Sequence, residues 1–166
     1  SVGIGDPFLP DRYDLVFIGG GQDFEQNLLH DDLVDGKGPL IRRAVEADMV
    51  FLCICGGYQM MGHYYEEQNG DRISCIGALD LYTKARSDRL TGDLVCRSDE
   101  FFARGLDPLL IGFENHSGRT FLGSSAKPLA TVLHGHGNNG RDGTEGARYR
   151  NVFATYSHGS FLPKNP

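Results

Sequence analysis

The sequence predicts one α/β domain over residues 1–166, built on a mostly parallel central sheet with an antiparallel portion in its second half. Two short apolar runs flank a segment with helical periodicity, which is the pattern of a β–α–β unit. Beyond residue 75 the chain changes to short strand-like runs separated by Gly, Pro and Asp. A length of 166 residues is enough for one domain with a hydrophobic core.

The first half of the chain contains the two expected parallel strands. "YDLVFI" spans residues 13–18 and ends in three glycines, and "DMVFLCI" spans residues 48–54 and is nearly all apolar. Such runs are typical of strands that are buried in a parallel sheet. Between them, apolar residues recur at helical spacing and predict a crossover in two helical pieces. These residues are Phe24, Leu28, Leu29 and Leu33, and then Leu40, Ile41, Ala44 and Val45.

The second half of the chain has the texture of an antiparallel sheet. Its strand-like runs cover residues 76–82, 91–97, 109–116, 129–134 and 151–158. Residues 135–150, "GHGNNGRDGTEGARYR", are rich in Gly, Asn and charge, so we expect an exposed loop there.

Composition and charge exclude several classes of function. Hydrophobic residues make up 40% of the chain and charged residues 23%, which is typical of a soluble globular domain. The net charge of -6 and the scattered basic residues argue against a nucleic-acid surface. Because no apolar run approaches the roughly 18 residues that span a bilayer, we expect no membrane insertion.

The four cysteines are spaced unlike a disulfide framework or a zinc site. Cys53, Cys55, Cys75 and Cys96 form no CxxC pair, so we expect no metal and a reducing, cytoplasmic location. The chain begins at Ser1 and stops just after a strand-like run. We therefore expect the domain to lack an N-terminal strand and a C-terminal helix.

Cys55 stands where a catalytic nucleophile is often found, between a predicted strand and a predicted helix. Gly56 and Gly57 follow it at once, and small residues allow the tight, strained turn that exposes such a side chain. The N–H groups at the start of the helix "YQMMGHYY" would favour a thiolate and could stabilise an oxyanion. The ordinary alternative is a core cysteine before a helix.

A thiol nucleophile needs a base, and His158 has the most suitable position among the six histidines. It ends the predicted strand at residues 151–158 and precedes Gly159, which places it at the tip of a strand. His134 and His136 flank a glycine but lack the further ligands of a metal site.

The glycine-rich turn after the first strand is the third candidate element. Gly19 and Gly21 are followed by no third glycine of a dinucleotide motif, and no GKS or GKT occurs, so nucleotide binding is disfavoured. Close approach of backbone N–H groups to a substrate, as half of an oxyanion hole, suits this turn better.

These segments together resemble a known family. "CGGYQ" resembles the nucleophile elbow of class I glutamine amidotransferases, whose fold is flavodoxin-like. "GFENHSGRT" and "ATYSHG" are similar to segments of its cobyric-acid-synthase-like branch. With "FIGGGQDFEQ", "RLTGDLV", "GNN" and "LPKN", they most resemble the GatD family of glutaminase subunits of lipid II isoglutaminyl synthase.

The resemblance implies a glutaminase site. Cys55 would attack the side-chain amide of L-glutamine to give a thioester, and His158 would protonate the ammonia and then activate water. The resemblance also implies three further roles: the N–H groups of an oxyanion hole, a side chain that shapes the pocket, and a side chain that binds the α-carboxylate of glutamine. In the same order, the residues are Gly20, Gly21 and Gly56, then Gln59, and then Arg89, for which a solvated loop arginine is the alternative.

One position departs from the pattern of the superfamily. Its more familiar members carry a Glu two residues after the histidine, where this chain has Ser160. Another carboxylate such as Glu114, a backbone carbonyl or a residue outside this sequence could orient His158 instead.

The resemblance also implies a partner, because the chain has no ATP-binding pattern. In this family the partner is a Mur-ligase-like subunit of the MurT type, which would bind ATP and Mg²⁺ and use the ammonia to amidate the D-glutamate α-carboxylate of lipid II. This chain itself would need no cofactor. The alternatives are an amidotransferase domain for cobyrinic or cobyric acid and a catalytically silent domain that binds a partner.

Overall fold

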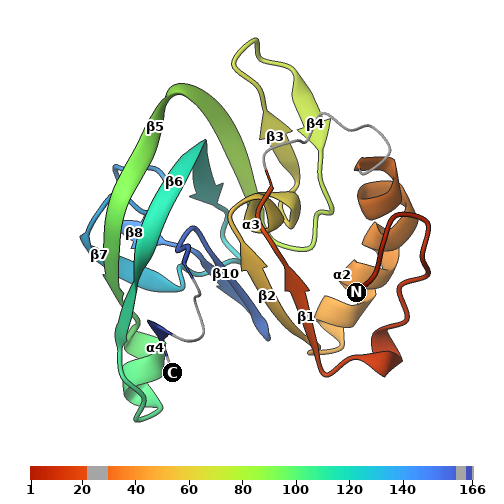
Figure 1. Cartoon of the computed structure of the whole chain (residues 1–166), viewed down its shortest axis with the longest axis horizontal. Helices are drawn as coiled ribbons and strands as arrows, with labels where there is room; N and C mark the ends of the chain where they lie inside the picture. The colour runs from red at the N-terminus through yellow and green to blue at the C-terminus, as the bar shows by residue number, and fades with distance from the viewer. Residues whose placement is uncertain (22–29, 160–163, 166) are drawn as a thin grey trace.

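The computed structural model describes residues 1–21, 30–159 and 164–165. Their strands form two sheets, one with parallel strands at its centre and one that is largely antiparallel. In Figure 1 the parallel strands lie between helix α2 on one side and the long pair of strands β5 and β6 on the other. This confirms the predicted α/β class with an antiparallel portion in the second half.

The first sheet brings three strand ends to one edge. Strands β1 (Leu15–Ile18) and β10 (Val152–Thr155) pair in parallel with the two sides of β2 (Val50–Ile54). Strand β9 (Ala147–Tyr149) adds to β10 in the antiparallel direction. Because the carboxyl ends of parallel strands share one edge, the segments that follow β1, β2 and β10 meet there.

The second sheet is built on a long, bulged pair of strands. Strand β5 (Leu81–Arg97) pairs with β6 (Leu109–Leu122) along one side, and the short helix α4 (Asp99–Ala103) lies between them in the chain. The other side of β5 carries two strands, each with one further neighbour. These are β3 (Tyr64–Glu66) with β4 (Arg72–Ser74), and β7 (Ala130–His134) with β8 (Thr144–Glu145). The run predicted over residues 91–97 lies wholly within β5, but only the last two residues of the run over residues 76–82 belong to it, and residues 76–80 form no strand.

In the described residues the helical part of the crossover is continuous from Asp31 to Glu46. A 3₁₀ turn, η1, covers Pro10–Arg12, and a π-helical segment, η2 (Asp31–Lys37), continues into α2 (Gly38–Glu46). Helix α2 buries Ile41, Ala44 and Val45 as expected, but Leu40 is exposed. The predicted first helical piece, which begins at Phe24, falls largely outside the described residues.

The helix after Cys55 ends much earlier than predicted. Helix α3 covers only Gly56–Met60, and the following tyrosines belong to β3. In the described part of the chain, no helix is both long and apolar enough to cross a bilayer.

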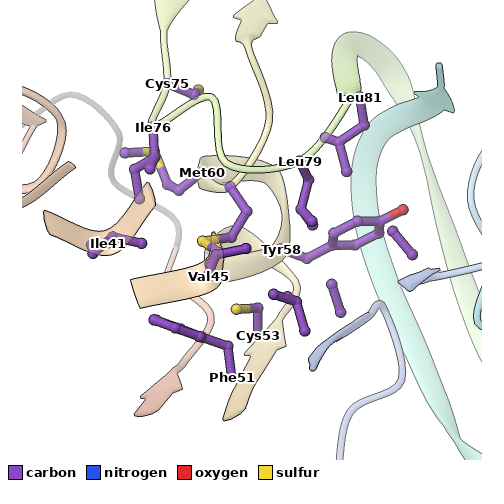
Figure 2. Close-up of a cluster of buried hydrophobic side chains, with 14 of the residues drawn as sticks. Ile41, Val45, Phe51, Cys53, Tyr58, Met60, Cys75, Ile76, Leu79 and Leu81 are labelled. Atoms are coloured by element: carbon purple, nitrogen blue, oxygen red, sulfur yellow. The ribbon is translucent and has the colours of Figure 1, made fainter. Parts of the chain in front are cut away.

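A hydrophobic core supports the edge where the three strand ends meet. Figure 2 shows side chains from α2, β2 and α3 pointing into one cluster, which the segment before β5 closes. Cys53 and Tyr58 belong to this cluster and are completely buried. The backbone on both sides of Cys55 is thereby anchored in packed structure.

The segment over residues 135–150 is not the exposed loop that its composition predicted. It contains β8 and β9, and Asn138 and Glu145 are almost completely buried. The side-chain oxygen of Asn138 accepts a hydrogen bond from Gly146 N–H at 2.9 Å, and its amide nitrogen donates one to Gly146 O at 2.9 Å. Asn138 can be buried here because its side chain binds backbone groups of the same segment, and Glu145 because it accepts hydrogen bonds from Thr155 and Tyr156.

Candidate active site

Cys55 has the strained backbone that was predicted for it. Its φ of 51° and ψ of -105° lie outside the conformations that residues with a Cβ commonly adopt. The residue links β2 directly to α3, and its N–H donates a hydrogen bond of 2.9 Å to Thr155 O at the end of β10. Such strain persists only where the surroundings impose it, and it is common at active sites.

Two glycines allow the turn to approach the neighbouring strand. A Cβ atom on Gly57 would lie 2.3 Å from the carbonyl oxygen of Ile18, the last residue of β1. A Cβ atom on Gly56 would lie 2.8 Å from the carbonyl oxygen of Gly21. Only glycine fits at either position without a shift of the backbone. The structure thus brings together the two glycine-containing turns that the sequence suggested as an oxyanion hole.

His158 lies beside the same turns. A Cβ atom on Gly20 would be 3.2 Å from the Cβ of Cys55 and 3.6 Å from Cε1 of His158. Gly20 therefore occupies a position between the thiol-bearing residue and the imidazole. Nε2 of His158 is buried and has no hydrogen-bond partner within the described segments.

Burial disfavours the charged form of both groups. It raises the pKa of the Cys55 thiol, and the nearby Gly56 N–H and the positive charge of Arg89 only partly oppose it. Burial also lowers the pKa of His158, with a smaller effect in the same direction from His116. The expectation that the helix would favour a thiolate is therefore wrong for the free site, because α3 is short and desolvation dominates.

Glu114 is not placed to orient His158. Its carboxylate is completely buried and accepts hydrogen bonds from His136 N–H at 2.6 Å and Gly137 N–H at 2.9 Å. Nε2 of His116 lies 3.5 Å from Oε2, the carboxylate oxygen that also accepts from Gly137. Burial alone would raise the pKa of Glu114, but the hydrogen bonds outweigh burial and lower it. Glu114 and Phe113 are neighbours in β6, so their side chains lie on opposite faces of the strand. His158 contacts Phe113 and therefore lies on the face away from Glu114.

Gln59 and Arg89 take different positions around the cysteine. Gln59 is buried and donates a hydrogen bond of 3.0 Å to the hydroxyl of Tyr156, the residue that follows β10. Arg89 is exposed within the bulged part of β5. Its guanidinium donates two hydrogen bonds to Asn115, at 2.9 and 3.1 Å.

Three residues near the site were missed by the sequence reasoning. Asn115 accepts hydrogen bonds from Arg89, and Phe113 stacks on His158. Tyr65 lies close enough to Cys55 and Arg89 for electrostatic interactions with both to affect its pKa. Asn115 and Phe113 lie in "GFENHSGRT", so the motif itself was a usable signal for both.

Ser160 lies outside the described residues, as does all of "QDFEQ" after the glycines. Among the described side chains, no group of three or more His, Cys, Asp or Glu residues could hold a metal ion.

The chain is similar to two curated lipid II isoglutaminyl synthase (glutamine-hydrolyzing) GatD subunits. It is 43% identical to that of Streptococcus pneumoniae over 99% of this chain and 61% of the relative, and 44% identical to that of Staphylococcus aureus over 93% and 60%. The chain thus spans about three-fifths of the length of these relatives. It is also 32% identical to a cobyric acid synthase of Pelotomaculum thermopropionicum, over 89% of this chain and 30% of that protein.

Solved structures share the fold at low sequence identity. A glutamine amidotransferase from Thermotoga maritima matches with a TM-score of 0.59 and 19% identity, over 89% of this chain and 56% of that one. The structure of PurLQS from the same organism matches with a TM-score of 0.60 and 17% identity, over 95% and 73%.

A family model covers nearly the whole sequence. The CobB/CobQ-like glutamine amidotransferase domain matches residues 2–166, which include the Cys55 turn, the glycine-rich turn and His158. The chain therefore belongs to the family of CobB/CobQ-like glutamine amidotransferase domains.

Proposed function

We propose that this domain hydrolyses L-glutamine and supplies ammonia for the amidation of lipid II. The observation that carries the proposal is the meeting of Cys55, in its strained turn, with His158 around Gly20. Family membership and the similarity to two GatD subunits support the choice of glutamine as the substrate.

The reaction begins from a neutral thiol and a neutral imidazole. As the sulfur of Cys55 bonds to the amide carbon of glutamine, His158 accepts the thiol proton. The carbonyl oxygen gains negative charge, and the N–H groups of Gly20, Gly21 and Gly56 stabilise it as an oxyanion hole. His158 then gives its proton to the departing nitrogen, which leaves as ammonia while the γ-glutamyl thioester remains on Cys55.

Hydrolysis of the thioester completes the cycle. His158 takes a proton from water, the resulting hydroxide adds to the thioester carbon, and the bond to sulfur breaks to release glutamate. The protonated imidazole returns its proton to the sulfur of Cys55. The lowered pKa of His158 suits this role, because a neutral imidazole is required before each attack.

Arg89 binds the α-carboxylate of glutamine in this proposal. Its exposed guanidinium is held by Asn115 and is near enough to Cys55 to lower the pKa of the thiol. A planar guanidinium can bind a carboxylate through two hydrogen bonds, which fixes both position and orientation.

In this proposal a second protein uses the ammonia. We propose a Mur-ligase-like partner of the MurT type that binds ATP and Mg²⁺ and activates the D-glutamate α-carboxylate of lipid II. The curated relatives are each named as a subunit of a synthase, which supports a partner. The proposal includes a cytoplasmic location, since thiol chemistry needs reduced cysteine and all four cysteines are free.

The test is glutamate release from L-glutamine by the full-length protein, alone and with the Mur-ligase-like partner. Activity that is lost in Cys55→Ala and in His158→Gln supports the glutaminase. Amidation of cobyrinic acid instead of lipid II would move the acceptor to the cobalamin branch, to which the 32% identical relative belongs. No release from a folded complex would favour a silent binding domain.

A further inference from the structure

His158 is oriented without a carboxylate in the described structure. Glu114, the carboxylate that the sequence suggested for this role, accepts hydrogen bonds from His136 and Gly137 instead. No other described carboxylate forms a hydrogen bond with the imidazole of His158. A general base of this kind still needs a fixed ring, because proton transfer depends on its distance and angle to the sulfur.

Phe113 of β6 makes the contacts that fix this ring. Its backbone and that of His158 form an isolated antiparallel bridge, with His158 N–H donating to Phe113 O at 2.7 Å and Phe113 N–H to His158 O at 3.4 Å. The two side-chain rings stack with their centroids 5.4 Å apart and an angle of 25° between their planes. The backbone and the imidazole are therefore held by the same residue.

Two glycines make room for this arrangement. A Cβ atom on Gly112 would lie 2.0 Å from Oγ of Ser157 and 2.8 Å from His158 O. A Cβ atom on Gly159, whose φ is 85°, would lie 3.0 Å from Cε1 of the Phe113 ring. The approach of β6 to the histidine thus depends on the absence of side chains on both segments.

We propose that Phe113 is a positioning residue for His158 and does by ring stacking what a carboxylate does in the more familiar amidotransferases. This role deepens the proposed glutaminase and rests on it. An offset stacked pair restricts the rotation of both rings and covers one face of the imidazole from water. Unlike a carboxylate, it adds no charge that would stabilise an imidazolium.

The titratable groups around His158 are consistent with a positioning role for Phe113. The titratable groups close to it in the described structure are His116 from β6, Cys55 from the turn after β2, and Lys164, whose Nζ lies near Gly159. None of these groups stabilises a protonated imidazole. Removal of the Phe113 ring would hydrate His158 and bring its pKa back toward the ordinary value.

The experiment compares four forms of the full-length protein with its partner: the wild type, Phe113→Ala, Phe113→Tyr and the control Ile111→Ala. Ile111 is an exposed apolar residue on the same face of β6, two positions earlier. We expect Phe113→Ala to lower kcat for glutamine hydrolysis about three- to tenfold with little change in KM. The acidic limb of its kcat/KM profile should shift to higher pH, because that limb reports the pKa of the general base in the free enzyme, and this pKa rises when His158 is hydrated.

The tyrosine variant separates stacking from a general structural effect. Phe113→Tyr keeps the ring and should retain the wild-type rate and pH profile, as should Ile111→Ala. Equal loss in the tyrosine and alanine variants, or a wild-type pH profile in Phe113→Ala, would overturn the proposal.

Failure of the glutaminase itself is distinguishable from failure of this inference. If the wild-type complex releases no glutamate, the proposed function falls, and the imidazole can still be followed by NMR with labelled histidine. A raised His158 pKa and a more mobile ring in Phe113→Ala, but not in Ile111→Ala, would support the positioning role. Unchanged imidazole signals in Phe113→Ala would refute it.

Discussion

The strained turn at Cys55 predicts an inverted effect of glycine on stability. At an ordinary position, replacement of Ala by Gly costs roughly 0.5–1 kcal/mol because glycine loses more backbone entropy on folding. At position 55 the surrounding structure imposes a φ of 51° and a ψ of -105°. Any residue with a Cβ adopts these angles at a cost of about 1–3 kcal/mol, which glycine does not incur. The difference between these effects makes Cys55→Gly about 1 kcal/mol more stable than Cys55→Ala.

Thermal and urea denaturation of the two variants measure this difference. For a chain of 166 residues, 1 kcal/mol corresponds to a shift in Tm of about 2–4 °C. The matched control is Cys53, which is buried two residues earlier within β2 and has no positive φ. There, Cys53→Gly should unfold at a lower temperature than Cys53→Ala. If Cys55→Gly is also the less stable of its pair, the turn stores no backbone strain and the reasoning is wrong.

Three further predictions concern packing and charge. Gly57→Ala should destabilise the fold by about 1–3 kcal/mol and abolish hydrolysis, since its Cβ would meet a backbone oxygen at 2.3 Å, whereas Gly36→Ala, where a Cβ meets only ordinary contacts, should stabilise the fold by up to about 1 kcal/mol in the same denaturation assay. Burial raises the pKa of Glu145, so the native state binds more protons than the unfolded state and stability falls as pH rises through the folded pKa; urea titrations should show a weaker fall for Glu145→Gln. Alkylation of Cys55 by iodoacetamide should reach half its maximum rate above the ordinary thiol pKa of about 8.5, and Arg89→Ala should move that midpoint higher; a lower midpoint would contradict the assigned charge effect.

The sequence was most informative where local chemistry imposes a conformation. A nearly continuous apolar run followed by Cys55 and two glycines predicted a buried strand and a tight turn, and both are present. The family resemblance rested on several separated motifs and is confirmed by a match over residues 2–166. The catalytic roles of Cys55 and His158 stay predictions, although the structure brings both residues to Gly20.

The sequence was least informative where long-range contacts override local composition. Residues 135–150 have the composition of an exposed loop, but strands β7 and β10 give their backbone partners and bury Glu145. The helix after Cys55 stops at Met60 because Tyr64–Glu66 pair with β4 and β5. Neither outcome can be read from a window of neighbouring residues, since the partners are distant in the chain.

The sequence by itself thus determined the order of the elements, the strained cysteine turn and the family, because glycine placement and apolar runs act on their immediate neighbours. Only the tertiary structure decided the protonation of the site and the neighbours of His158. Desolvation of Cys55 depends on everything packed around it, and the contact between Phe113 and His158 joins residues 45 positions apart through an antiparallel bridge. Such effects arise from distance and burial, which exist only once the chain has folded.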